Sequence, residues 1–356
     1  MLPGQRVAGL HHAGGGTQPV TAQEIISAAA PTAPLLSVRD LSVRAGALPL
    51  VHEISFDLEP GTMTALVGES GSGKSLTAQA ILGLLNREVY AVAGTAMTFQ
   101  GQALGFDGQS RPRGFHGELT GYVMQDPSSA LDPTMTVGRQ IAEMFVVHRG
   151  MDRRSALGEA ARMLDRVRIP DAGARIDDYP HQFSGGMKQR VLIAMAVALS
   201  PRLLVADEPT TALDVTVQAD ILALIDDLRR EMQMAVLIIT HDFGVVYQCA
   251  DRVMVMYAGK LVEGGATLQI TESGRHPYTR GLIASIPDLD DLDRPVVAIP
   301  GQPPRPERSW DGSCAFQPRC SFKAPRCAAE APEMETLGGG ALVRCFEWRR
   351  VEESPS

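Results

Sequence analysis

The sequence predicts an α/β fold in which a parallel sheet carries a phosphate-binding loop. The segment 68–75 fits the pattern G-x-x-x-x-G-K-[ST] at every fixed position. A short apolar run, 64–67, precedes it, and apolar residues at helical spacing follow it. Two further apolar runs, 203–206 and 235–239, are typical of parallel strands covered on both faces. A helical pattern between these runs completes a strand–helix–strand unit.

The elements before the loop read as strands. The first 33 residues are rich in Gly, Ala, Thr and Pro, which predicts a disordered or poorly ordered tail over 1–33. Strand-like runs follow at 36–39 and 41–44. In 54–58, apolar and polar residues alternate, which indicates a strand with one solvated face. A Pro-Gly turn at 60–61 then leads into the strand before the loop.

The loop itself is expected to bind the phosphates of a nucleotide. Glycines between a strand and a helix let backbone N–H groups surround phosphates, and the helix start adds partial positive charge. Lys74 would reach the β- and γ-phosphates, and the Ser75 hydroxyl would ligate Mg²⁺. The alternative, a Gly/Ser-rich turn with a chance lysine, is disfavoured by the strand and helix on either side. The residues expected to contact the nucleotide are Gly68, Glu69, Ser70, Gly71, Ser72, Gly73, Lys74, Ser75 and Leu76.

Later elements define the rest of the organisation. Strand material and a Gly-rich, basic loop fill 91–124, and a helical pattern covers 137–164. Past residue 287 the content of Pro, Arg and Cys rises and regular patterning fades. We therefore expect an ATPase-like domain over 34–286 and a separate small module over 287–356.

Composition limits the classes of function. A length of 356 residues suggests two or three domains. The formal net charge of −8 argues against nucleic-acid binding as the main role. No apolar run approaches the roughly 20 residues that span a bilayer, and the N-terminus has no apolar signal core, so we expect a cytosolic protein. Five cysteines in a cytosolic chain indicate ligands or core residues rather than disulfides.

Two acidic residues follow the apolar strand 203–206. Carboxylates at the C-terminal end of a parallel strand face the same crevice as a phosphate loop. Asp207 can hold Mg²⁺, and Glu208 is placed to polarise an attacking water as a general base. The alternative is an acidic pair that caps the next helix, and the neighbouring phosphate loop disfavours it.

A second potential anion site opens a long helix that runs through Ala198. Ser184, Gly185 and Gly186 stand at its start, where backbone N–H groups are free. In isolation this pattern favours an ordinary helix N-cap with flexible glycines.

The order of motifs resembles that of the ATP-binding subunits of ABC transporters. Six motifs occur in sequence over about 180 residues, too many for coincidence. They are the phosphate loop Gly68 to Ser75, Gln125 in Tyr122-Val123-Met124-Gln125-Asp126-Pro127, the signature Ser184-Gly185-Gly186, Asp207-Glu208, Thr211-Ala212-Leu213-Asp214, and His241 in Ile239-Thr240-His241-Asp242.

The resemblance implies roles that the residues alone do not. It assigns Gln125 to Mg²⁺, the attacking water and coupling to a membrane partner, Asp214 to a dimer contact loop, and His241 to the γ-phosphate of ATP. Without the resemblance, a histidine after a strand is usually structural. In the family, two such domains pack head to tail, and each signature completes the partner's ATP site.

Two details point to a branch and one departs from the family. The form Gly-Gly-Met-x-Gln-Arg at 185–190 and the run Arg275-His276-Pro277-Tyr278-Thr279-Arg280 resemble the importers of oligopeptides and dipeptides. The aromatic residue that usually stacks on adenine is missing, because no Tyr, Phe or Trp lies between Leu35 and Ile54. Base stacking is then weaker or supplied from elsewhere.

Four cysteines lie close together near the C-terminus: Cys314, Cys320, Cys327 and Cys345. From their spacing alone, zinc, an iron–sulfur cluster and unpaired thiols all remain open, with zinc first on general frequency. The importer branch shares a Cys-rich tail with Phe316-x-Pro318-Arg319-Cys320, and some members bind a cluster there. The resemblance therefore implies a [4Fe–4S] cluster, with zinc as the alternative.

The complete prediction is a P-loop NTPase of ABC type with a mixed central sheet, an antiparallel β-subdomain, a helical subdomain near 127–200 and a Cys-rich C-terminal module. It would hydrolyse ATP to energise peptide import. Its expected partners are two membrane permeases, a second homologous ATPase subunit in a heterodimer and an extracytoplasmic peptide-binding protein. The subunit would lie peripherally at the cytoplasmic face of the membrane.

Three other functions share features with this prediction. An importer of nickel or another small solute would share the fold. A soluble ABC ATPase of DNA repair or translation is disfavoured, because the chain has one cassette, no long coiled-coil insertion and an acidic balance. A non-hydrolysing partner is disfavoured by the presence of Lys74, Glu208 and His241.

Overall fold

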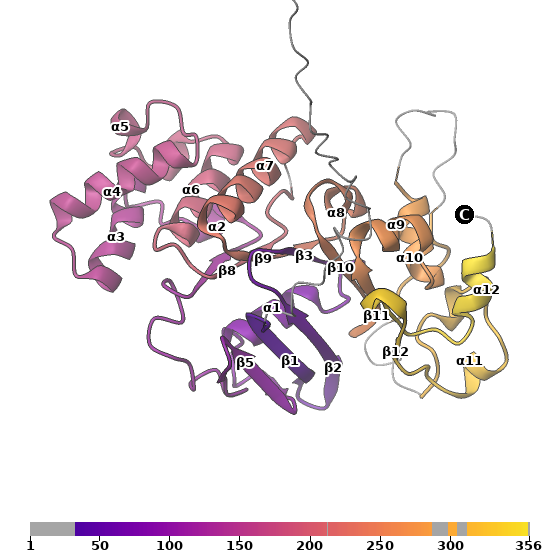
Figure 1. The fold of residues 1–356 in the computed structure, drawn as a ribbon. Coiled ribbons are helices and arrows are strands. Elements are labelled where there is room, and N and C mark those ends of the chain that lie inside the picture. The colour runs from indigo at the N-terminus through magenta and orange to yellow at the C-terminus, as the bar shows by residue number, and fades with distance from the viewer. Residues whose placement is uncertain (1–32, 212, 287–297, 305–311, 355–356) are drawn as a thin grey trace, which may run out of the picture. The chain divides into compact units, whose positions relative to one another are not determined.

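Two β-sheets face one another across a buried apolar layer in the computed structural model, which describes residues 33–211, 213–286, 298–304 and 312–354 (Figure 1). The smaller sheet is antiparallel in the order β2-β1-β5-β6, with β4 also paired to β1. It forms because its strands alternate buried and exposed side chains. Its strands are β1 (Leu36–Ala45), β2 (Leu48–Leu58), β4 (Tyr90–Ala93), β5 (Ala96–Phe99) and β6 (Gln102–Ala103).

The larger sheet is mixed and carries the phosphate loop. Its order is β12-β13-β11-β10-β3-β9-β8-β7, and the pairs from β10 to β7 are parallel while the other three are antiparallel. The strands are β3 (Met63–Val67), β7 (Thr120–Val123), β8 (Leu203–Asp207), β9 (Ala235–Thr240), β10 (Arg252–Tyr257), β11 (Lys260–Ala266), β12 (Glu335–Thr336) and β13 (Leu342–Val343).

Both faces of this sheet are covered, as the continuous apolar runs predict. In β3, Ala65 packs in the core on one face and Leu66 in the core on the other. In β9, Ile238 and Ile239 divide in the same way. Burying each face against different elements fixes the register of the parallel strands and so the place where they end.

Helices fill most of residues 127–197, the range in which the sequence predicts a helical subdomain (Figure 1). The helices are α1 (Lys74–Leu82), α2 (Pro127–Ala130), α3 (Val137–Arg149), α4 (Arg153–Arg166), α5 (Ala172–Arg175), α6 (Gly185–Val197), α7 (Val215–Met232), α8 (Phe243–Cys249), α9 (Thr267–Ser273), α10 (Pro277–Ala284), α11 (Arg326–Ala329) and α12 (Trp348–Glu353). Short 3₁₀ turns are η1 (Pro180–Gln182), η3 (Gln317–Arg319) and η4 (Gly338–Gly340).

The described C-terminal residues, 298–304 and 312–354, are named the C-terminal segment below. The structure gives no support to a separate module here, because β13 pairs with β11 and thereby extends the large sheet. Phe316 is buried in the same core as the central strands. A segment this short cannot bury an apolar core of its own, and the open edge of β11 offers both backbone partners and apolar surface.

The predicted tail 1–33 lies almost wholly outside the described residues. No helix in the described ranges is long and apolar enough to cross a bilayer.

Candidate functional site

The phosphate loop connects β3 to α1, and its glycines are required by close packing. Gly68 has φ +155°, and a Cβ there would come within 2.1 Å of the Met256 carbonyl oxygen. Gly73 caps α1 with φ +102°, a conformation that other residues rarely adopt. The turn after β10 supports the loop from behind, since the Gly259 N–H donates to the Ser72 carbonyl at 2.9 Å.

Lys74 turns back over the loop. Its ammonium group donates to the carbonyl oxygens of Gly68 at 2.7 Å and Glu69 at 3.0 Å. Burial lowers the pKa of Lys74, while the charges of Glu208, Asp207 and Glu69 oppose this shift. A buried ammonium group beside the backbone N–H groups of a Gly-rich loop is suited to receive a polyphosphate.

Asp207 ends β8 beside the first turn of α1. Its carboxylate accepts from the Ser75 hydroxyl at 2.9 Å and from the Tyr122 hydroxyl at 3.3 Å. Burial raises the pKa of Asp207, and the two hydroxyl donors partly offset that shift. A hydroxyl and a carboxylate oxygen held together are ligands of the kind that Mg²⁺ prefers. The donor chemistry here therefore fits the predicted Mg²⁺ site.

Three side chains surround the Glu208 carboxylate. It accepts from Gln125 Nε2 at 2.9 Å and from the Thr211 hydroxyl at 2.8 Å, and His241 Nδ1 lies 3.4 Å away. Its backbone has φ +46°, a left-handed conformation rare outside glycine. The structure thus brings together Gln125, Glu208 and His241, which the sequence predicts to act on the same phosphate.

Two neighbours of this site were not identified as functional from the sequence. Thr211 orients Glu208, and its position three residues later is the signal that could have revealed it. Tyr122 was noted only as part of the Gln125 motif, yet its hydroxyl contacts Asp207.

The signature lies apart from these residues. Ser184 caps α6, and its hydroxyl accepts from the Met187 N–H at 3.3 Å. The side chains of Ser184 and Asp214 are exposed, and no hydrogen bond or ion pair joins the signature to the phosphate loop within the described residues. A Cβ on Gly186 would lie 2.6 Å from Val217 Cγ1, which places the signature beside the start of α7, capped by Asp214.

The strand β1, where the family usually has the aromatic residue that stacks on adenine, contains no aromatic side chain. Residues 46 and 47 form the turn between β1 and β2. The strand β4 pairs with β1 so that Tyr90 lies opposite Ala45. Tyr90 is therefore the nearest aromatic residue by strand register to the turn that lacks one.

The four cysteines of the C-terminal segment are neighbours. The Cys314 N–H donates to the Cys327 carbonyl at 2.9 Å. Burial raises the pKa of Cys345 to about 12 and of Cys320 to about 11, and the other thiols of the group push both further upward.

No group of three or more His, Cys, Asp or Glu side chains in the described ranges is arranged to hold a metal ion. The predicted ligation of a [4Fe–4S] cluster or zinc by Cys314, Cys320, Cys327 and Cys345 therefore has no support from the structure. Cys314 and Cys320 are partly buried and pack against the apolar core as small side chains.

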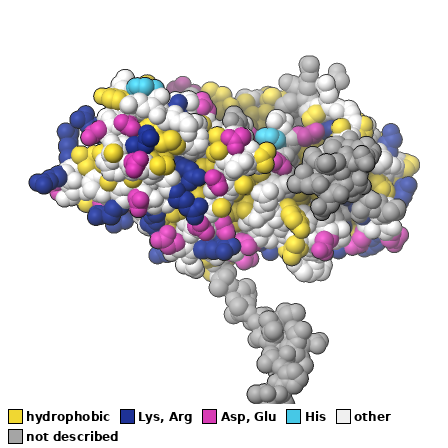
Figure 2. Space-filling view, turned by 90° about the horizontal axis from the view of Figure 1, so that it is seen from above, with side chains coloured by type: hydrophobic (Ala, Val, Ile, Leu, Met, Phe, Trp, Pro, Cys, Tyr) yellow, Lys and Arg dark blue, Asp and Glu magenta, His cyan; other side chains and the backbone are white. Residues whose placement is uncertain are grey.

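The surface carries charges of both signs. Figure 2 shows acidic and basic side chains interspersed on the viewed face, with no continuous basic band.

Comparison with known proteins gives matches over both halves of the chain. Residues 51–211 match the family described as ABC transporter, and residues 262–327 match the oligopeptide/dipeptide transporter C-terminal region. The oligopeptide transport ATP-binding protein OppD of Haemophilus influenzae is 45% identical over 319 residues, covering 88% of this chain and 97% of that protein. OppD of Salmonella typhimurium is 43% identical over 323 residues, covering 90% and 95%.

Further relatives agree. A Brucella abortus protein described as a peptide import ATP-binding protein is 48% identical over 319 residues, covering 88% of this chain and 95% of that protein. Among solved structures, cbiO1 of Clostridium perfringens, part of an ABC transporter complex, has a TM-score of 0.58 at 24% identity, covering 67% of this chain and 91% of that chain. At that identity the likeness shows the fold alone.

Proposed function

Since the chain belongs to the ATP-binding subunits of oligopeptide and dipeptide ABC transporters, we propose how its own residues hydrolyse ATP and which chains complete its sites. Its function is that of an ATPase that energises oligopeptide import. The observation that carries the proposal is the convergence of Lys74, the Ser75–Asp207 pair and the Glu208 group.

The first step is binding of the triphosphate. Lys74 gives up its two backbone carbonyl acceptors and donates to the β- and γ-phosphates, while backbone N–H groups of the loop donate to the other phosphate oxygens. Ser75 and Asp207 would hold Mg²⁺, and Gln125 would offer its Oε1 because its Nε2 is already engaged by Glu208. The bound Mg²⁺ would neutralise developing charge on the phosphate oxygens.

The second step is attack by water. Glu208 is the general base, oriented by Gln125 and by the Thr211 hydroxyl. His241 stands on the other side of the carboxylate with its side chain 52% exposed, so it is free to donate to a γ-phosphate. Two groups that flank the base from different strands fix the direction of attack.

The signature completes a different site. Ser184, Gly185 and Gly186 present free helix N–H groups on an exposed surface, together with Asp214. This placement supports a head-to-tail pair in which each chain closes the other's ATP, and we propose a second, homologous ATPase subunit as the partner.

The remaining partners follow from the import function. Transport requires a channel through the membrane, and the chain binds membrane permeases for that purpose. We propose two permease chains, contacted near Gln125, and an extracytoplasmic protein that delivers the peptide. The chain would then lie peripherally at the cytoplasmic face of the membrane.

Uptake by the reconstituted complex tests which substrate is transported. The assembled transporter in proteoliposomes should take up labelled oligopeptides when ATP and Mg²⁺ are present on the side of this chain. Nickel ions in place of peptide should not accumulate. Uptake of nickel without peptide would replace the peptide proposal with the nickel alternative.

A [4Fe–4S] cluster in the C-terminal segment is proposed on narrower grounds. Its support is the close grouping of Cys314, Cys320, Cys327 and Cys345, whose thiols influence one another's charge. Four thiolates are the ligand set such a cluster takes, and Cys320 would be among them. Anaerobically purified chain should contain iron and acid-labile sulfide in equal amounts. Stoichiometric zinc, or no metal, would contradict the cluster.

A further inference from the structure

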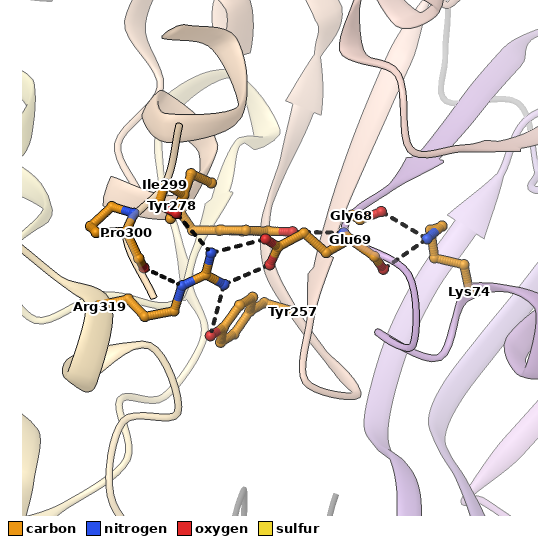
Figure 3. A network of polar contacts seen from close by, with 8 residues as sticks. All are labelled: Gly68, Glu69, Lys74, Tyr257, Tyr278, Ile299, Pro300 and Arg319. Carbon is orange, nitrogen blue, oxygen red and sulfur yellow. Dashed lines mark hydrogen bonds and ion pairs between the residues drawn. The ribbon is translucent and has the colours of Figure 1, made fainter. Parts of the chain in front are cut away.

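The phosphate loop is hydrogen-bonded to residues that lie more than 200 positions away in the sequence. The Glu69 carboxylate accepts from Arg319 Nη1 at 2.7 Å and from Nη2 at 2.9 Å, a bidentate pair. The Glu69 N–H donates to the Tyr278 hydroxyl at 2.8 Å, and its carbonyl accepts from Lys74. Figure 3 shows Arg319 reaching from the C-terminal segment to Glu69, on the side of the loop opposite Lys74.

Arg319 is built into its position. Its side chain is 4% exposed, and Nε donates to the Pro300 carbonyl at 2.8 Å. The Ile299 carbonyl and the Tyr257 hydroxyl, each at 3.4 Å, accept the remaining donors. A buried guanidinium with this many satisfied donors has one orientation. Bonding to Glu69 keeps the pKa of Arg319 above its ordinary value, so it stays charged.

An aromatic cluster fixes the turn that carries Arg319. Phe316, at the start of η3, packs edge-on against Tyr257 with ring centroids 5.2 Å apart, and lies 5.5 Å from Tyr278 and 5.6 Å from His276. All four rings are buried. The cluster joins the C-terminal segment to the end of β10 and the start of α10, so the arginine moves only if this contact opens.

The pair has an electrostatic consequence for ATP. Glu69 is the only acidic residue in the loop 68–75, and its charge acts on Lys74. Left unpaired, that carboxylate would repel the polyphosphate that the loop binds. A second arginine–glutamate pair, Arg275 with Glu352 at 2.8 Å, also connects the C-terminal segment to the residues just before α10. Neither of its members contacts the phosphate loop.

We propose that Arg319 is a positioning residue for ATP: through its bidentate pair with Glu69, the C-terminal segment neutralises and orients the phosphate loop. The proposal rests on the ATPase function proposed above. It makes the C-terminal segment part of the nucleotide site, although the segment supplies no group that touches the phosphates.

The test compares KM for ATP with kcat in the full-length chain within its assembled transporter. Arg319→Met should raise KM roughly tenfold, equivalent to about 1.4 kcal/mol, and change kcat less than about twofold. Arg319→Lys keeps the charge and should raise KM less than about threefold. Adding Glu69→Gln to Arg319→Met removes the unpaired carboxylate. The double variant should therefore reverse at least half of the increase in log KM that Arg319→Met causes.

The matched control is Arg275→Met, which removes an arginine–glutamate pair from the same contact and should leave KM unchanged. A purely structural role for Arg319 predicts that the double variant binds ATP no better than Arg319→Met, and that result would overturn the proposal. An unchanged KM in Arg319→Met would also overturn it.

Arg319→Met is informative only if it unfolds cooperatively on heating, which shows that it is folded. If it does not, Glu69→Gln alone tests the proposal. Glu69→Gln leaves the positive charge of Arg319 beside the loop with no carboxylate to neutralise it, so KM should fall below that of the wild type. A KM equal to or above the wild-type value would contradict the proposal. If the wild-type assembly shows no Mg²⁺-dependent hydrolysis at all, the ATPase function itself fails, which is a separate outcome.

Discussion

At the scale of single residues, the site consists of pairs whose members lie far apart in the chain. Gln125, Glu208 and His241 were predicted to act together, and their side chains meet. Glu208 could be predicted because it follows a parallel strand, and such strands end at the edge that carries the phosphate loop. The roles of Gln125 and His241 were predicted only from the resemblance to ABC transporters. Arg319 could not be predicted, because its contact with Glu69 depends on how a segment without regular pattern folds back.

Replacement of Glu208 by Gln tests the general base. The amide keeps the hydrogen bond with Thr211 but cannot accept a proton, so turnover should fall by about 10²-fold or more while ATP binding persists. Single-turnover hydrolysis and nucleotide retention in the same preparation measure the two effects. Glu88→Gln, an exposed residue away from the site, serves as the control. Turnover within a few fold of the wild type would show that another group is the base.

At the scale of elements, the ends of strands and helices carry the chemistry. The strands β8 and β9 present Asp207 and His241, and α6 presents the signature. The sequence predicted these elements because their apolar patterns are long and regular. It did not predict that β12 and β13 continue the large sheet, because strands of two residues leave no periodic pattern.

The start of α6 offers a substitution that the chain itself tolerates. A Cβ on Gly185 would meet only Leu213 Cδ2, at 3.7 Å, so Gly185→Val fits the chain's own fold. In the head-to-tail pair the same methyl groups would face the partner's phosphate, and ATP hydrolysis at that site should fall at least about tenfold. Gly173→Val, at a glycine with nothing within 4 Å, is the matched control. Equal thermal stability with equal activity in both variants would contradict the signature's role.

The junction of β11 and α10 predicts a pH dependence of stability. Glu263 is 1% exposed and accepts the N–H groups of Arg275 and His276. Burial outweighs these donors and raises its pKa to about 7, from an ordinary value of 4.5. The folded state thus binds a proton that the unfolded state releases. Its contribution to the free energy of unfolding is full below pH 4.5 and falls as pH rises to 7.

Denaturant unfolding of Glu263→Gln between pH 4.5 and 8 measures this contribution. The wild type should lose stability relative to Glu263→Gln by roughly 3 kcal/mol across the window and change little above pH 7. Glu272→Gln, on the exposed surface of α9, should track the wild type. A constant difference between wild type and Glu263→Gln at every pH would show that Glu263 does not titrate in this range.

At the scale of the whole molecule, the proposed head-to-tail pair divides the functional residues of the chain into two half-sites. The phosphate loop with Asp207, Glu208 and His241 forms one, and the exposed signature with Asp214 forms the other. Because the two half-sites lie apart, the sequence could predict the residues of each one. It could not identify the partner chain that would complete them. The matches to the two family regions, over residues 51–211 and 262–327, identify the class of assembly, whereas the partner surfaces are made by other chains.

Recovery of the assembly from native membranes decides which chains those are. A tagged chain extracted in mild detergent should bring down permease chains and a second, homologous ATPase subunit, since in the proposed head-to-tail pair the signature completes a partner's ATP site. The Glu208→Gln variant with ATP and Mg²⁺ should increase recovery of that subunit, because ATP bound without hydrolysis holds two such domains together. The same variant with Gly185→Val added should lose the increase while keeping the permeases. Recovery of permeases with two copies of this chain, and no second ATPase, would replace the heterodimer with a homodimer.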